Sequence, residues 1–305
     1  MKILHWLTWI TSSATLVATA QEWKFPCPEN EIASYTAYHV SQPIKIDGKL
    51  DEKVWEQAPR SPRFKDIITG QPALYGTYAT VVWDETNLYV AFRVEEPLVR
   101  AGITKHNQPV WQGNDVEFFV AGQDAYYEFE INALNTTYEA FFIWSEAYER
   151  GGFAALPEFE RAQLREFNGV GYADHPRGKR LRQPHWDFPG LQTAVVIDGT
   201  LNDDTDRDRG WTVELAFPWK GMASLAKSDG RALPPKEGDV WRMDFSRFNS
   251  YKEASPAKDS GGWFWTRHGI WDSHIPECFA KIRFTTNDLN PAIANHEIPT
   301  HINQN

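Results

Sequence analysis

Short runs of alternating apolar and polar residues recur along the chain from Ile44 onwards, and Gly, Pro, Asn and Asp separate them. This pattern predicts many short strands joined by turns, because successive side chains of a strand point to opposite faces of a sheet. The predicted strands are residues 79–83, 88–95, 115–121, 126–132, 138–143, 192–197, 212–217, 240–248 and 280–284. We therefore expect an all-β protein, folded as an antiparallel β-sandwich of the jelly-roll type.

Helical patterns are short and few. They cover residues 52–57, where Asp51 is a suitable N-cap, residues 158–166 and a turn at 219–225. Residues 145–189 lack strand alternation and mix Gly, Pro, Arg and His, which predicts one long irregular loop inserted into the sandwich. No linker divides the chain. A single domain is expected over residues 21–286, and a polar C-terminal tail over residues 287–305.

The chain begins with a pattern typical of a secretory signal peptide. A short basic start is followed by a largely apolar run over residues 3–17 and by a small-x-small cleavage site, Ala18-Thr19-Ala20. We expect a signal peptide over residues 1–20, a mature chain that begins near Gln21, and a secreted or periplasmic location. No other segment is apolar enough to cross a bilayer, so membrane insertion is not expected.

Composition narrows the functional classes. An apolar share of 42% is sufficient for one sizeable core. The formal net charge of -10 disfavours a sequence-independent grip on nucleic acid, which needs clustered Lys and Arg. Cys27 and Cys278 are the two cysteines and stand near opposite ends of the mature chain. In an oxidising compartment they form either a disulfide or two buried thiols.

Two neighbouring strands are predicted to share a carboxylate-rich face. Alternation places Asp115 and Glu117 on one side of their strand, and Glu128 and Glu130 on one side of the next. Adjacent carboxylates repel one another unless cations, arginines or hydroxyl-rich ligands lie between them. Arg93 points to the polar side of its own strand and could neutralise them. The alternative interpretation is a solvated sheet face.

Six motifs follow one another between about Ile44 and Phe284. They are Ile46-Asp47-Gly48-Lys49-Leu50-Asp51-Glu52 with Trp55 and Ala58-Pro59; Val82-Trp83-Asp84 with Asn87-Leu88-Tyr89-Val90; Asn114-Asp115-Val116-Glu117-Phe118-Phe119; Tyr126-Tyr127-Glu128-Phe129-Glu130-Ile131-Asn132; Gly210-Trp211-Thr212-Val213-Glu214 with Pro218-Trp219; and Gly238-Asp239-Val240-Trp241-Arg242. In these motifs and their order the sequence resembles the family 9 carbohydrate-binding modules of the DOMON-like superfamily.

The resemblance implies a β-sandwich that clamps a sugar, often a chain end, between two tryptophans and reads its hydroxyls with polar side chains. It assigns one clamp to Trp111, six residues before Glu117, and sugar contacts to Glu117 and Asn132. Sugar-binding members carry an arginine where this chain has Glu130, and a glutamate lacks the planar donor fork of an arginine.

The second clamp of the resembled family is out of register in this chain. Trp271 stands two residues early, Ser273 occupies the aligned position, and Trp265 is further off. The predicted carbohydrate-binding residues are Trp111, Glu117, Glu130, Asn132 and Trp271. The two departures, at Glu130 and at the second clamp, leave chain-end recognition open.

Tryptophan is unusually abundant, with 14 residues in the chain, so some are expected to be exposed. Trp83, Trp211 and Trp241 stand in or beside predicted strands and are expected in the core. Trp111 precedes Gln112-Gly113-Asn114, which favours a loop and exposure over core packing. An indole that covers about 100 Å² of the C–H face of a sugar contributes roughly 2.5 kcal/mol before association costs.

An acidic loop is a candidate calcium site. Asp204, Asp206 and Asp208 recur at a spacing of two, which suits a cation that prefers oxygen ligands. The alternative is a solvated turn. Calcium is the one cofactor that the sequence suggests.

Four basic residues stand near Trp186 in the predicted long loop of an otherwise acidic chain. They are Arg177, Lys179, Arg180 and Arg182. Basic side chains beside an aromatic ring could recognise sulfated or uronic sugars. The alternative is a solvated insert.

Two other functions are weighed against sugar binding. A glycoside hydrolase would use a carboxylate pair such as Glu117 and Glu130. A haem-binding module of the same superfamily would use Met243 with His268 or His274 as axial ligands. The sequence contains no serine-hydrolase elbow, Gly-rich phosphate loop or Cys/His zinc spacing. We expect a secreted, non-catalytic protein that binds oligo- or polysaccharides, alone or beside a partner glycoside hydrolase.

Overall fold

The computed structural model describes residues 23–250 and 259–289. The predicted signal peptide at residues 1–20 and most of the predicted polar tail lie outside these ranges. Within the described ranges, no helix is both long and apolar enough to span a bilayer.

Strands dominate the described part of the chain, and helices are short. The strands are β1 (Ser34–His39), β2 (Lys65–Asp66), β3 (Thr77–Trp83), β4 (Asn87–Glu95), β5 (Asp115–Ala121), β6 (Ala125–Asn132), β7 (Thr137–Trp144), β8 (Arg165–Phe167), β9 (Arg180–Pro184), β10 (Gln192–Asp198), β11 (Gly210–Pro218), β12 (Val240–Phe248), β13 (Gly262–Phe264) and β14 (Ala280–Asp288). The α-helices are α1 (Lys53–Gln57) and α2 (Ala223–Ala226). The 3-10 helices are η1 (Glu29–Glu31), η2 (Val110–Gln112), η3 (Ser145–Ala147), η4 (Phe153–Ala155), η5 (Pro157–Phe159), η6 (Trp219–Met222) and η7 (Pro276–Cys278).

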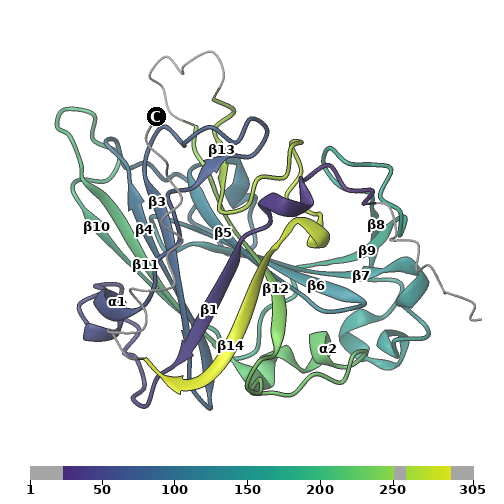
Figure 1. Ribbon diagram of the computed structural model, residues 1–305. Coiled ribbons are helices and arrows are strands. Elements are labelled where there is room, and N and C mark those ends of the chain that lie inside the picture. Colours follow the sequence, from purple (N-terminus) through teal and green to yellow (C-terminus); the bar gives the residue numbers. More distant parts are fainter. Residues whose placement is uncertain (1–22, 251–258, 290–305) are drawn as a thin grey trace, which may run out of the picture.

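The strands form two layers that pack face to face (Figure 1). One layer has the order β10-β11-β4-β3, and the other has the order β14-β12-β5-β6-β7-β9-β8. β1 pairs with β14 along its length and with β3 only at Tyr38 and His39, so it joins the two layers. Aromatic rings fill the space between the layers. The ring centroids of Phe118 on β5 and Phe217 on β11 are 4.9 Å apart. The predicted β-sandwich is confirmed.

β1 runs parallel to β14, whereas the sequence predicts an antiparallel sandwich. Cys27 and Cys278 precede these two strands and form a disulfide, with their Cα atoms 5.8 Å apart. The bridge brings the starts of β1 and β14 to the same end of the sheet, and strands that begin at the same end run parallel. Of the two states that the sequence left open for the cysteines, the structure has the disulfide.

The nine strands predicted from alternation are all present, with ends that differ by at most four residues. Two helical predictions are wrong. Residues 158–166 contain only the end of η5 and the beginning of β8. The N-cap of α1 is Glu52 rather than Asp51, and its side chain makes no capping hydrogen bond.

Residues 145–189, predicted as one irregular loop, contain β8 and β9. Both strands extend the second layer beyond β7. Alternation is hidden here because arginines occupy the face of β9 that points away from the core between the layers, opposite Leu181. Arg180 is fully buried, and its guanidinium lies 4.9 Å from the ring centroid of Trp144. A cation that packs on an aromatic face can be buried, which a simple apolar pattern does not reveal.

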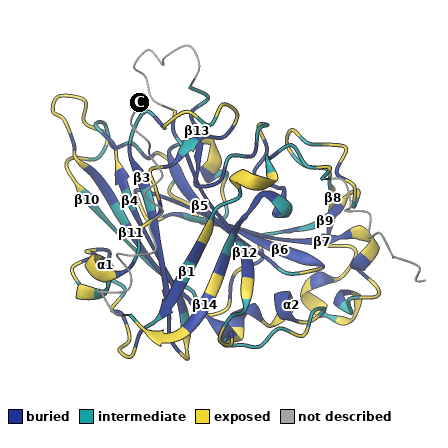
Figure 2. Cartoon of the chain, in the orientation of Figure 1, coloured by how far each residue is buried: buried dark blue, intermediate teal, exposed yellow. Residues whose placement is uncertain are grey.

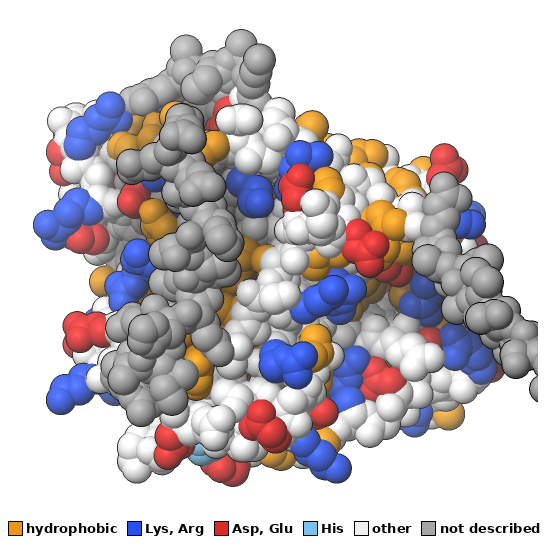
Figure 3. Space-filling model, in the orientation of Figure 1, with side chains coloured by type: hydrophobic (Ala, Val, Ile, Leu, Met, Phe, Trp, Pro, Cys, Tyr) orange, Lys and Arg blue, Asp and Glu red, His pale blue; other side chains and the backbone are white. Residues whose placement is uncertain are grey.

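The strands are largely buried, and exposed residues gather in the loops and around α1 (Figure 2). Trp83, Trp211 and Trp241 are 2–3% exposed, as predicted for core residues. On the face that Figure 3 shows, acidic and basic side chains are interspersed. Such a surface does not form the single-sign basic stripe that nucleic-acid binding requires.

A buried carboxylate holds the first family motif in place. Glu214 of β11 accepts hydrogen bonds from the amides of Asp47 and Gly48 at 2.9 and 2.6 Å, and from the indole of Trp55 at 2.7 Å. Gly48 has a φ of +83°, and a Cβ there would lie 2.9 Å from the backbone of Val195. These motif residues therefore build the sandwich.

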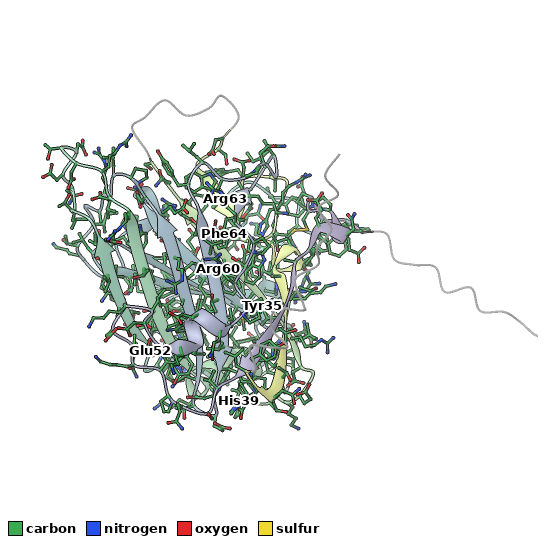
Figure 4. The ribbon with its side chains drawn as sticks, turned by 60° about the vertical axis from the view of Figure 1, so that its left-hand side comes forward. Tyr35, His39, Glu52, Arg60, Arg63 and Phe64 are labelled. Carbon is green, nitrogen blue, oxygen red and sulfur yellow. A yellow bond between two sulfur atoms is a disulfide. The ribbon has the colours of Figure 1, made fainter. Side chains whose placement is uncertain are left out.

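The segment between α1 and β2 lies beside β1 and β3 (Figure 4). The hydroxyl of Tyr35 on β1 donates to the carbonyl of Pro59 at 2.7 Å. The guanidinium of Arg63 donates to the carbonyl of Ala73 at 3.1–3.2 Å. Phe64 is fully buried in the core. This segment therefore closes one open side of the sandwich.

Candidate functional site

Other parts of the chain cover the carboxylate-rich face of β5 and β6. Glu117 and Glu130 lie directly opposite each other in the antiparallel pair, on the face that alternation predicts. Asp115, Glu117, Glu128 and Glu130 are each at most 5% exposed. Their cover consists of η2 and the segment between β13 and β14. The interpretation as a solvated sheet face is therefore wrong.

A cavity of about 230 Å³ opens above this face. Three carboxyl side chains form its floor, those of Glu117, Glu128 and Glu130. The other lining residues are Trp111, Tyr138, Phe142, Phe167, Val170, Arg182, Phe248, Trp271, Ser273 and His274. Pockets for drug-sized ligands measure about 300–1,000 Å³, so this smaller cavity suits a single ring or a short end of a chain.

Trp111 and Trp271 stand at the rim of the cavity. Their exposed fractions are 41% and 40%, and no other tryptophan of the described residues is as exposed. The exposure expected for Trp111 is therefore confirmed. The two indoles come from η2 and from the β13–β14 connection, which are far apart in the sequence, and both line one cavity.

Glu130 and Tyr138 hold Trp111 in position. The backbone amide of Trp111 donates to Oε2 of Glu130 at 3.0 Å. Its indole contacts Tyr138 edge-on, with ring centroids 4.8 Å apart. Glu130, which replaces the arginine of the resembled family, thus positions the rim tryptophan and lines the floor.

Asp272 fixes the backbone around Trp271. One of its carboxylate oxygens accepts hydrogen bonds from the amides of Val170, Gly171 and Tyr172 at 2.8–3.0 Å. A Cβ on Gly171 would lie 2.2 Å from the carbonyl oxygen of Trp271, so only glycine permits this approach. The β13–β14 connection and the segment before β9 are therefore joined at the rim.

Burial dominates the electrostatics of the floor and of Asp115 beside it. Burial raises the pKa values of Asp115, Glu117 and Glu130 well above their ordinary range, and repulsion from neighbouring carboxyls, Glu128 in each case, raises them further. A hydrogen bond from the Ser246 hydroxyl to Glu117, at 2.7 Å, opposes this effect. Without a cation or a donor-rich ligand, burial shifts these carboxyls toward their protonated form.

Residues around the floor carry hydrogen-bond donors. Arg182 of β9 lines the cavity and donates to the hydroxyl of Tyr138. Burial lowers the pKa of His274 to about 3, so its imidazole is neutral, and its Nε2 lies 3.4 Å from Glu128. Burial raises the pKa of Glu128 to about 8, although Arg182 acts in the opposite direction. Alternation gave no signal that Arg182, Glu128 and His274 would meet.

Two predicted polar residues are placed elsewhere. The side chain of Asn132 donates to the carbonyl of Ile103 at 2.8 Å and accepts from the amides of Leu134 and Thr136, so it holds a turn and does not line the cavity. Arg93 lies on β4 in the other layer, where burial and Arg60 lower its pKa. Its predicted role as the counter-charge of the carboxylates is wrong, because the sandwich places β4 across the core from β5.

The basic residues near Trp186 do not form one patch. Arg177 pairs with Glu146 at 2.7 Å, and Lys179 pairs with Glu166 at 2.8 Å. Arg180 is buried, and Arg182 reaches the cavity. Arg177 and Arg180 both pack on the ring of Trp144, with guanidinium carbons 4.6 and 4.9 Å from its centroid. Trp186 is 8% exposed, and its ring lies 4.9 Å from that of Phe141 in the core.

The aspartates of the acidic loop before β11 form hydrogen bonds and an ion pair with nearby residues. Asp208 is 8% exposed and accepts from the amides of Val99 and Thr200 at 2.7 and 2.6 Å. Asp206 accepts from the Thr200 hydroxyl at 2.7 Å, and Asp204 pairs with Arg100. Two groups of described residues bring three potential metal ligands within 4.8 Å of one another, and neither includes these aspartates. Calcium in this loop stays a prediction.

The geometry does not support the haem alternative. Met243 is fully buried in the core between the layers. His268 lies on the opposite face of β12, where its Nε2 is 3.3 Å from Asp244. A methionine and a histidine on opposite faces of one sheet cannot ligate the same iron.

The electrostatics of the floor disfavour the hydrolase alternative. Burial raises the pKa values of Glu117 and Glu130. This shift disfavours the ionised form that a nucleophile or a base requires.

A family model matches the part of the chain that carries the floor and one rim tryptophan. Residues 46–147 match the family described as "Carbohydrate family 9 binding domain-like". This match confirms the resemblance to family 9 carbohydrate-binding modules over these residues. The family is one of binding domains, in agreement with the expectation that the protein is not an enzyme. No curated protein matches the chain significantly.

One solved structure shares the overall fold at low sequence identity, and two others are similar to the chain at lower TM-scores. A protein from Bacteroides uniformis, described provisionally as carbohydrate-binding, is 14% identical, with a TM-score of 0.54 over 83% of this chain and 99% of that chain. A family 9 module from Caldicellulosiruptor kristjanssonii, solved with cellotriose, is 14% identical, with a TM-score of 0.45 over 84% and 95% of the two chains. A family 9 module from the same organism, solved with glucose, is 14% identical, with a TM-score of 0.44 over 84% of this chain and 98% of that chain.

Proposed function

We propose that this protein is a secreted, non-catalytic carbohydrate-binding protein that holds a sugar in the cavity between Trp111 and Trp271. One observation carries the proposal: the two most exposed tryptophans of the described residues line the same cavity. Indole faces cover the apolar C–H face of a sugar ring, while Arg182 and the floor carboxyls can pair with its hydroxyls.

The size of the expected affinity follows from the buried area. Two indoles that each cover about 100 Å² of sugar contribute roughly 5 kcal/mol before association costs. With a few hydrogen bonds, this gives dissociation constants on the order of micromolar to millimolar. The match of residues 46–147 to a carbohydrate-binding family supports the same conclusion. Secretion rests on the predicted signal peptide, and a partner glycoside hydrolase stays a prediction.

Calorimetric titration of the mature chain with a panel of neutral oligosaccharides tests the proposal. Trp111→Ala and Trp271→Ala are each expected to weaken binding at least tenfold, because each removes roughly 2.5 kcal/mol of ring contact. Ile68→Ala is the matched control, since Ile68 is 41% exposed and does not line the cavity.

Two different outcomes would reject the position of the binding site and the carbohydrate-binding function. Equal affinities for the wild type and both tryptophan variants would reject the cavity as the binding site. A folded wild type that binds no member of a broad glycan array would reject carbohydrate binding itself.

A further inference from the structure

Three carboxylates converge beneath the proposed sugar cavity. Oxygens of Asp115, Glu117 and Glu130 all lie within 4.8 Å of one another. The three residues are 0%, 2% and 2% exposed. Since calcium binds oxygen at about 2.3–2.6 Å, a single ion placed among these oxygens can contact all three.

Among the described residues, no Lys, Arg or His forms a salt bridge with any of the three carboxylates. Arg247 of β12 points to Glu96, with 3.4 Å between Nη2 and Oε2. Arg182 lines the cavity wall but donates to Tyr138. Buried carboxylates are normally paired or bound to a metal.

A second observation concerns Asp115 alone. Its Oδ1 accepts from the amide of Phe248 at 3.3 Å, whereas its Oδ2 has no hydrogen-bond partner among the described residues. The residue is fully buried and shares the face of β5 that carries Glu117. A carboxylate oxygen without a partner at such depth is destabilising, and a bound cation would satisfy it.

We propose that Asp115, Glu117 and Glu130 bind one divalent cation, with calcium as the best match, and that glycan binding in the cavity depends on it. The donor set consists of carboxylate oxygens, which suit calcium better than metals that prefer nitrogen or sulfur. Glu117 and Glu130 also line the cavity, so further coordination positions of the ion face the place of the sugar, where hydroxyl groups can complete them. The second part of this proposal, that glycan binding depends on the cation, rests on the proposed function; the cation site itself does not.

Calcium titration of the metal-free mature chain, without sugar, tests the cation site. We expect one calcium per chain and a rise in Tm of about 5 °C at a calcium concentration a hundredfold above Kd. Asp115→Asn and Glu130→Gln should each weaken calcium binding at least a hundredfold. Asp206→Asn is the control, because it removes a carboxylate from the acidic loop before β11 and should leave calcium binding unchanged.

The amide variants are expected to fold, because they remove like charges from a buried cluster. In EDTA, Asp115→Asn should melt no lower than the wild type, and added calcium should not shift its Tm. Calcium binding that persists in both amide variants, or that is lost in Asp206→Asn, would overturn the cation site. So would a wild type that binds no calcium.

A glycan arm separates this inference from the proposed function. Chelation of calcium should weaken the affinity of the wild type for its best oligosaccharide at least tenfold. The glycan affinity that remains in Asp115→Asn should be the same with and without the chelator. Calcium binding with unchanged glycan affinity would overturn the dependence. Calcium binding by a protein that binds no glycan with or without calcium would overturn the proposed function and leave the cation site standing.

Discussion

Glu130 shows how one residue can change the chemistry of a site. In the resembled family an arginine stands at this position, and it would bring a donor fork to the floor. Here Glu130 accepts a hydrogen bond from the backbone amide of Trp111. It also forms a cluster of three carboxylates with Asp115 and Glu117. The guanidinium comes instead from Arg182 on β9. The same kinds of group are present, but different strands supply them.

A buried pair formed by His268 and Asp244 makes the free energy of unfolding dependent on pH. Nε2 of His268 lies 3.3 Å from Asp244, and its Nδ1 donates to the carbonyl of Asp272 at 2.7 Å. Burial lowers the pKa of His268, but attraction to Asp244 and Asp272 outweighs burial and raises it above the ordinary value. The folded state therefore holds this proton more tightly than the unfolded state does. The stabilisation is complete below about pH 6.5 and is lost as the pH rises through the folded pKa.

The expected result is a pH-dependent difference between the wild type and the double variant His268→Gln, Asp244→Asn. Urea unfolding in EDTA between pH 6 and pH 9 should show that the free-energy advantage of the wild type shrinks as the pH rises. A difference that stays constant over this range would contradict the charged pair.

At the scale of elements, the rim depends on the contact between the β13–β14 connection and the segment before β9. Asp272 makes this contact by accepting hydrogen bonds from the backbone amides of Val170, Gly171 and Tyr172. Local alternation could not predict the contact, because the two segments form no regular strand there and are far apart in the chain. β9 was also missed, since its buried arginines resemble a polar loop in the sequence.

Asp272→Ala should therefore reduce both stability and glycan affinity. The loss of hydrogen bonds to a buried carboxylate costs about 2–4 kcal/mol in the free energy of unfolding, measured by urea denaturation. The displaced loop should also weaken glycan binding at least tenfold. Asp84→Ala is the control: Asp84 accepts two loop amides at 2.7 Å away from the cavity. It should destabilise the fold and leave glycan affinity unchanged; equal losses of affinity in both variants would contradict a specific role for Asp272.

At the scale of the whole molecule, the disulfide closes the described chain on itself. Cys27 and Cys278 are 251 residues apart in the sequence, and they bring β1 to β14. Because β1 also pairs with β3, this closure links the two layers of the sandwich. A long closed loop restricts the unfolded chain strongly.

Replacing both cysteines with serine should lower the free energy of unfolding by about 3–5 kcal/mol. Calorimetric melting of the two forms measures the change, and a reductant should lower the Tm of the wild type but not that of the variant. Glycan affinity is the control, since neither cysteine lines the cavity. A variant as stable as the wild type would show that the bridge adds nothing to the fold.

The sequence by itself determined nine of the fourteen described strands, their faces and the tryptophans of the core. These features follow from a period of two residues, which is local, and burial of the apolar side then requires two packed layers. Only the tertiary structure decided that Trp111, Trp271 and Arg182 meet above one floor, and that Arg93 does not. Such meetings depend on how loops cross a sheet between distant segments, and no local periodicity encodes them. The parallel pairing of β1 with β14 has the same origin, because it joins segments that are far apart in the sequence.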